Sequence, residues 1–351
     1  MMRVHARSLL GGIGLALLLC PQSARAWESG EIRLRGRLQT RYEIADKDEE
    51  DGGGWYNRFE LRRARLDGRW DPSGWVRLVL ELEAADGAEL MDAYGRLSIH
   101  DAFRVQAGHF KKPFSRLKMD SAWEIPLPVR GLLNRDGIAT DSHGGYGDRD
   151  LGLMLSGRFK KLLRLRYFVG VFTGPGIVDG EGEERKDFVG RIQFRPFKGF
   201  RLAVDASHKL YTDEEGITRT RNLFGADARF KIGDFGLQLE GAYGDNLEAG
   251  PDEVAHRLWG AHGIATYALK LGEDWVLTPA FMVEVFDPDD RASGRVVRLA
   301  GALNLDVYAK LRVVLFAEGA LGELEIHYHN DVSDVERRVP TRIMAQLNLA
   351  F

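Results

Sequence analysis

The sequence predicts an all-β protein, a transmembrane antiparallel β-barrel of about 16 strands. Three observations predict this fold: an export signal at the start of the chain, an alternating segment that ends on an aromatic residue, and period-two patterning between them. Beyond residue 26, no apolar run reaches the roughly 18–20 residues that a membrane-spanning helix needs. No linker or low-complexity segment divides the 351 residues, so we expect one barrel domain over residues 27–351.

The first 26 residues have the features of a secretory signal peptide. Arg3 and Arg7 form a basic start, residues 9–19 form an apolar stretch too short to span a membrane, and residues 24–26 give an A-x-A cleavage site. We expect cleavage after Ala26, with a short membrane anchor as the alternative. Cleavage removes three arginines, no acidic residue and the only cysteine, so the net charge falls from −3 to −6 and no disulfide stabilises the mature chain.

The C-terminal segment, residues 341–351, alternates strictly between apolar and polar side chains. A soluble sandwich could also end on such a strand, but the export signal favours a barrel. A strand that stops on an aromatic residue resembles the signal read by the bacterial outer-membrane assembly machinery, so we expect Phe351 to contact that machinery. The apolar face carries Ile343, Ala345, Leu347, Leu349 and Phe351, and the other carries Arg342, Gln346 and Asn348.

The segments between the two ends also alternate with a period of two, as strands with one wet face do. The first of them, residues 32–44, is about twice as long as a usual soluble strand. The phase slips at Arg62-Arg63, within the segment 59–70, which predicts a β-bulge. An apolar spacing of two, rather than about 3.6, excludes a helical interpretation. Similar alternation occurs over residues 76–83, 163–169 and 275–284.

Short turns and longer polar loops alternate along the chain, which is typical of bacterial outer-membrane barrels. Seven short turns and eight loops imply about sixteen strands. Trp70 and Trp75 flank one short turn, as an interfacial aromatic girdle requires. The short turns are 71–74, 100–102, 159–161, 196–199, 231–234, 270–274 and a link near Asp306. The loops are 46–54, 111–148, 173–187, 211–220, 245–256, 287–294, about 322–340 and, as a short exception, 85–88.

If the apolar faces meet lipid, the alternate positions face a water-filled pore with a basic wall. On this face basic residues outnumber acidic ones roughly two to one, and guanidinium groups favour anions. For a single arginine, a neutralised structural pair across a strand is the alternative. The arginines at two-residue spacing on the first strand repel one another unless acids or anions compensate them. The acids concentrate in predicted outer loops, at residues 46–51, 179–184, 213–215, 252–253 and 287–290.

The third outer loop, residues 111–148, is too long for a simple connection, so we expect it to fold into the pore. Lys111 and Lys112 at its start would then place positive charge at a constriction. An ordinary surface loop is the alternative. The side chains expected to anchor the loop against the wall are Phe114, Trp123, Leu132 and Leu133.

Several segments resemble the phosphate-selective porin O and P family over nearly the whole mature chain, among them residues 59–66, 108–115, 149–153 and 188–192 and the final Phe351. The resemblance implies a trimeric 16-stranded outer-membrane porin in which anions pass an arginine ladder and a basic constriction. The chain departs from the family pattern because it is short, net acidic and lined by both charge signs, which bears on phosphate specificity and not on the porin assignment. The expected solutes are anions, phosphate or other small oxyanions. The ladder corresponds to Arg33, Arg35, Arg37, Arg58, Arg62, Arg63 and Arg65, and the constriction to Lys111 and Lys112.

The sequence therefore predicts a bacterial outer-membrane porin for passive diffusion of small solutes, with a preference for anions. Its expected partners are outer-membrane lipid and lipopolysaccharide, two further copies of the chain and small anions, without nucleic acid, metal or cofactor. The nine histidines show no metal-ligand spacing, and His327-Tyr328-His329 is more typical of a solvated surface. Two alternatives remain open: a plugged barrel with a structural or adhesive role, and an outer-membrane hydrolase using Ser142-His143.

Overall fold

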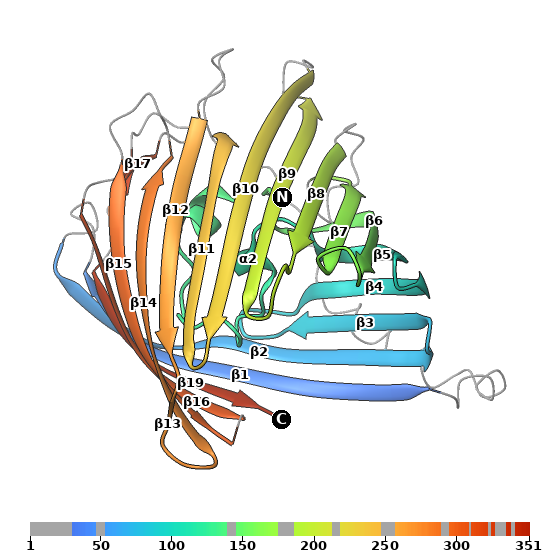
Figure 1. Ribbon diagram of the computed structural model, residues 1–351. Helices are drawn as coiled ribbons and strands as arrows, with labels where there is room; N and C mark the ends of the chain where they lie inside the picture. Colours follow the sequence, from blue (N-terminus) through green and yellow to red (C-terminus); the bar gives the residue numbers. More distant parts are fainter. Residues whose placement is uncertain are drawn as a thin grey trace, which may run out of the picture.

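The computed structural model describes residues 30–46, 53–138, 145–174, 186–212, 218–246, 257–288, 295–308, 310–321, 324–326, 335–337 and 341–351. Over these residues the chain forms a closed antiparallel barrel of sixteen strands, which confirms the predicted fold (Figure 1). Each strand pairs with the next, and β19 pairs with β1 from Arg37↔Ala350 to Ala45↔Arg342, which closes the sheet. Within the described part of the chain, no helix is long and apolar enough to cross a membrane.

The barrel strands have the following bounds. They are β1 Glu31–Asp46, β2 Trp55–Ser73, β3 Val76–Glu83, β4 Glu89–His100, β5 Phe103–Lys111, β6 Arg149–Phe159, β7 Leu165–Phe172, β8 Lys186–Phe194, β9 Phe200–Thr212, β10 Thr218–Ile232, β11 Phe235–Asp245, β12 Arg257–Tyr267, β14 Trp275–Asp287, β15 Val296–Val307, β16 Leu311–Leu321 and β19 Arg342–Ala350. The short β13 (Leu269–Lys270) continues β12 along β14, and β17 (Leu324–Ile326) pairs with β18 (Val335–Arg337) in a separate hairpin. The third loop contains α2 (Arg116–Met119) and a π-helical turn, η3 (Leu133–Gly137).

Short turns connect the strands at one end of the barrel and longer connections at the other, as predicted. One turn differs from expectation: β7 begins at Leu165, so Leu163 and Arg164 belong to the turn rather than to the strand. Their φ angles of 46° and 48° lie in the left-handed region, and the N–H of Leu165 donates to the carbonyl of Leu162 at 2.7 Å. This tight local turn interrupts the alternation that the sequence shows.

The turn between β4 and β5 carries a carboxylate that joins it to the neighbouring turn. Asp101 pairs with Lys160 at 2.7 Å and with Arg158 at 3.0 Å. Hydrogen bonds from Lys160 and then Arg158 lower the pKa of Asp101 from its ordinary value of 3.8 to about 2. The turn is therefore linked electrostatically to the turn that follows β6.

The predicted bulge in β2 is confirmed. The register moves from Gln39↔Arg63 directly to Thr40↔Leu61, so Arg62 has no opposite residue on β1. A second local constraint is at Gly108 in β5, where φ is 130° and an added Cβ would lie 2.2 Å from the carbonyl oxygen of Ala93. Only glycine fits this approach of two strands without moving backbone.

The two faces of the sheet differ as a membrane barrel requires. Val283 is 40% exposed on the outside, whereas the next residue, Glu284, is 0% exposed on the inside. Exposed aromatic side chains lie next to the short turns, which fits the predicted interfacial girdle. They include Trp75, Phe103, Phe197, Phe235 and Trp275.

The third loop packs against one side of the inner wall. Two apolar clusters hold it there, and Figure 1 shows α2 enclosed by the strands. Phe114, Leu132 and Leu133 are buried in the first cluster, whose wall residues come from β5 to β8, β10 to β12, β14 and β15. Leu117, Ile125 and Leu127 lie in the second, mainly against β14, β15 and β16. The loop therefore packs against the wall from β5 round to β16, and a cavity remains next to the inner faces of β1 to β6.

Candidate functional site

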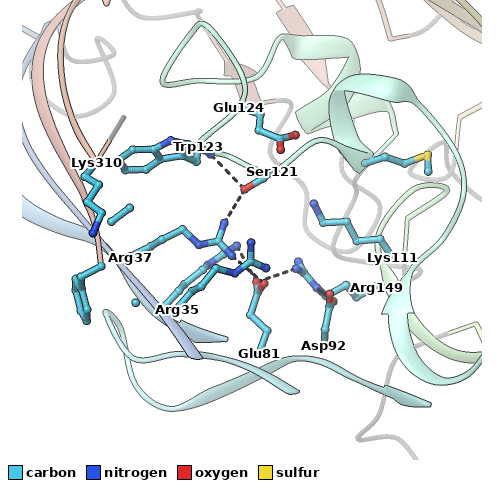
Figure 2. A pocket seen from close by; sticks show the side chains of 15 residues that line it. Arg35, Arg37, Glu81, Asp92, Lys111, Ser121, Trp123, Glu124, Arg149 and Lys310 are labelled. Carbon is cyan, nitrogen blue, oxygen red and sulfur yellow. Dashed lines mark hydrogen bonds and ion pairs between the residues drawn. The ribbon is translucent and has the colours of Figure 1, made fainter. Parts of the chain in front are cut away.

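A cavity of about 550 Å³ lies between the third loop and the wall formed by β1 to β6 (Figure 2). Its lining contains six basic and three acidic side chains. An excess of cations around a water-filled passage attracts anions. The basic residues are Arg35, Arg37, Arg65, Lys111, Arg149 and Lys310, and the acidic residues are Glu81, Asp92 and Glu124.

Three of the seven predicted ladder arginines line this cavity. Arg35 and Arg37 lie on β1, two residues apart on its inner face, and both donate to the buried Asp67 at 2.9 Å. Arg65 on β2 pairs with Glu83 at 2.6 Å. Cross-strand carboxylates therefore compensate the first-strand arginines, as the structural alternative predicted for single residues.

The other four predicted ladder residues do not line the cavity. Arg33 is half exposed near the start of β1 and pairs with Glu31 at 2.5 Å. The remaining three lie further along β2, where Arg58 bonds Glu43 at 3.1 Å. The bulge lies at Arg62 and Arg63 and gives them different partners. Arg62 lies 3.9 Å from Glu60, and Arg63 donates to Gln39 at 2.7 Å. The seven predicted ladder arginines therefore do not form one continuous row along the cavity.

Lys111, the last residue of β5, points into the cavity (Figure 2). Its Nζ donates to the backbone carbonyls of Lys118 at 3.0 Å and Asp120 at 3.3 Å. Within the described part of the chain, these contacts of its Nζ are to carbonyl oxygens and not to a carboxylate. Carbonyl dipoles therefore hold the Lys111 Nζ in place, whereas the arginines of the lining are held by carboxylates.

Lys112 does not line the cavity, contrary to the sequence prediction. Its side chain is fully buried, pairs with Asp187 and with Asp150 at 3.2 Å, and donates to the carbonyl of Gly145 at 3.0 Å. Burial alone would lower the pKa of Lys112, but the charges of Asp187 and Asp150 outweigh it and raise that pKa. Successive residues of an extended chain point to opposite sides, so only one of the two lysines faces the cavity.

Wall carboxylates hold the backbone of the third loop, a role that the sequence analysis did not identify. Glu284 on β14 accepts the N–H groups of Leu132 at 2.8 Å and Leu133 at 3.0 Å. Glu240 on β11 accepts the N–H of Leu117 at 3.0 Å and is also bonded by the Ser115 hydroxyl. Both appear in the sequence as ordinary inward acids, and nothing in their spacing indicates that they face a loop.

Two further arginines contribute positive charge and were also missed. Arg149, at the start of β6, pairs with Asp92 at 2.6 Å and lines the cavity. Arg130 in the loop donates to the carbonyls of Leu117 and Asp120, each at 3.0 Å. Burial, and then the charges of Arg65 and Arg149, lower the pKa of Arg130 to about 10.

Two alternative sites suggested by the sequence lie where the structure does not test them. Ser142-His143 and His327-Tyr328-His329 lie outside the described residues. Among the residues that are described, no group of three or more His, Cys, Asp or Glu side chains could hold a metal ion. The anchor predicted at Trp123 also differs, because this side chain lines the cavity rather than an apolar cluster.

A model of the family described as phosphate-selective porin O and P matches residues 32–240. The structure is similar to an anion-selective porin from Comamonas acidovorans, with a TM-score of 0.67 and 13% identity over 92% of this chain and 100% of that one. It is also similar to the trimer form of OmpT of Vibrio cholerae, with a TM-score of 0.65 and 12% identity over 92% and 100% of the two chains. The outer membrane channel DcaP of Acinetobacter baumannii gives a TM-score of 0.59 and 12% identity over 92% and 98%. No curated protein sequence matches significantly.

Proposed function

The chain belongs to the phosphate-selective porin O and P family, and on this basis we propose that it conducts small solutes by passive diffusion with a preference for anions such as phosphate. It is a porin of the bacterial outer membrane. The observation that carries the anion preference is the cavity beside the third loop, whose lining has twice as many basic as acidic side chains.

Within this cavity we assign the main electrostatic role to Lys111. The arginines that line the cavity each bind at least one carboxylate, whereas Lys111 binds only carbonyl oxygens. A cation without a nearby carboxylate keeps more of its field at the pore axis than a paired one. Arg35, Arg37 and Arg65 extend the basic wall away from it, and the other ladder residues would act at the pore entrances.

Several partners belong to the same proposal. The similarity to a trimer form supports a homotrimer. The exposed apolar face and aromatic girdle fit contact with outer-membrane lipid and lipopolysaccharide. The exposed Phe351 at the end of the closing strand fits recognition by the assembly machinery, and residues 1–26 fit a cleaved export signal.

The test is the reversal potential of the purified protein in a planar bilayer under a potassium chloride gradient. We expect a potential that reports chloride as the more permeant ion, with stepwise conductance increments. Cation selectivity would contradict the anion preference. A folded protein with zero conductance would favour the plugged barrel with a structural or adhesive role. No catalytic function is part of the proposal.

A further inference from the structure

Glu81 on β3 lies where three guanidinium groups from three different strands converge (Figure 2). Arg65 on β2 is 3.1 Å from its carboxylate, Arg149 on β6 is 3.3 Å away, and Arg37 on β1 is 3.4 Å away. All four side chains are mostly buried, with side-chain exposures of 12–19%. The Glu81 carboxylate also lines the cavity that we assign to the anion path.

Each of these arginines has a second, closer carboxylate. Arg37 is 2.9 Å from Asp67, Arg65 is 2.6 Å from Glu83, and Arg149 is 2.6 Å from Asp92. Arg37 is additionally held by the hydroxyl of Ser121 at 2.7 Å. The three guanidinium groups are therefore fixed by contacts other than the one with Glu81. Removal of the Glu81 charge should leave the arrangement of donors in place.

Three converging guanidinium groups are the donors that a small oxyanion needs, because each presents N–H groups in a planar fork. The Glu81 carboxylate accepts from all three, so it occupies the position that a mobile oxyanion would take. We propose that Glu81 is a specificity-determining residue, a tethered anion that competes with permeating oxyanions for this arginine cluster. Oxyanions then pass the cluster without being retained. This inference rests on the proposed anion path.

The decisive variant is Glu81→Gln, with inorganic phosphate as the probe. A unit charge changes the local concentration of a permeating ion about 6 Å away by about threefold, even at the dielectric constant of water. We therefore expect the chloride-to-potassium permeability ratio to rise at least about threefold. We also expect phosphate to block the chloride current at a concentration at least about tenfold lower than for the parent, because several charge-assisted bonds become available to it.

Two matched variants separate this role from general electrostatics. Glu81→Asp retains the charge and should resemble the parent in phosphate block. Glu124→Gln removes a carboxylate from the lining of the same cavity without touching the arginine cluster, so it should raise the permeability ratio but leave phosphate block unchanged. Unheated gel migration and thermal unfolding establish that each variant is folded.

Unchanged phosphate block in folded Glu81→Gln would overturn the inference, and so would an equal effect of Glu124→Gln. Titration calorimetry of phosphate into the detergent-solubilised proteins separates this result from the proposed function. Tighter phosphate binding by Glu81→Gln in a barrel that is cation-selective would support the arginine cluster while overturning the anion preference. An anion-selective parent whose Glu81→Gln variant binds phosphate no more tightly would overturn only the role of Glu81.

Discussion

Replacement of Glu284 by glutamine should loosen the third loop from the barrel wall. The Glu284 side chain is 0% exposed and its two oxygens accept the N–H groups of Leu132 and Leu133, while Arg298 donates at 3.1 Å. Glutamine keeps one acceptor oxygen, but its NH₂ group then faces one backbone N–H. The change removes one charge-assisted hydrogen bond and weakens the other, which costs about 2–3 kcal/mol.

That cost should raise the population of the detached loop by about 30- to 150-fold, because about 1.4 kcal/mol corresponds to a factor of ten. The mature chain expected after cleavage has no cysteine, so a single introduced thiol can report the detachment. Leu127→Cys places that thiol in the loop at a site that is 3% exposed. The rate of labelling by a water-soluble maleimide should rise in proportion to the open population when Glu284→Gln is added.

Glu43→Gln in the same Leu127→Cys background is the control. Glu43 is also 0% exposed, but its partners are Arg58 and Tyr56 on β2 and other wall side chains rather than loop backbone. Its labelling rate should stay near that of the parent. The reasoning is refuted if folded Glu284→Gln labels no faster than the parent, or if Glu43→Gln accelerates labelling to the same extent.

Three further changes test other parts of the structure. Lys111→Gln should lower the chloride-to-potassium permeability ratio by about threefold or more at unchanged stability. Lys112→Gln leaves buried carboxylates without their cation and should lower the unfolding temperature instead. Equal selectivity shifts in the two variants would contradict the placement of Lys111 alone in the anion path. Gly108→Ala should destabilise the barrel by more than about 2 kcal/mol because its Cβ meets backbone, while Gly190→Ala, with nothing nearer than 4.0 Å, should be tolerated in the same unfolding assay. Asp101→Asn removes a contribution to stability that is fully present above pH 3.8 and is lost as the pH falls through about 2. The unfolding temperatures of variant and parent should therefore differ at pH 7 and converge below about pH 2.

The fold could be predicted from the sequence because the membrane imposes rules that alternation reveals directly. Strands must turn one face to lipid and leave no free edge, so period-two patterning and the alternation of turns and loops were enough to give the strand number. Even the bulge at Arg62 was visible as a slip in phase. The turn containing Leu163 was misassigned because its apolar residues continue the alternation by chance while the backbone is already left-handed.

The site was predicted less completely, because it depends on which side chains meet across strands and loop. The sequence identified Arg35, Arg37, Arg65 and Lys111, which all line the cavity. It missed Arg149, which bonds the Glu81 carboxylate as Arg65 does but lies more than 80 residues away from Arg65 in the chain. The prediction also placed Lys112 in the pore. Lys111 ends a strand and Lys112 begins the loop, and the sequence alone does not show which of the two side chains faces the cavity.

The net charge of the chain says little about ion preference, because the loops and the cavity carry different balances. Six cations and three carboxylates line the cavity, and two further carboxylates that bind its arginines, Asp67 and Glu83, reduce the excess of cations from three to one. Such a small excess means that the loss of a single charge either abolishes it or doubles it. Neutralising Lys111 removes the excess, and neutralising Glu81 doubles it. Selectivity should therefore respond more strongly to these two residues than to the four ladder arginines that lie outside the cavity. The six cations are Arg35, Arg37, Arg65, Lys111, Arg149 and Lys310, and the five carboxylates are Glu81, Asp92 and Glu124 in the lining with Asp67 and Glu83 behind it.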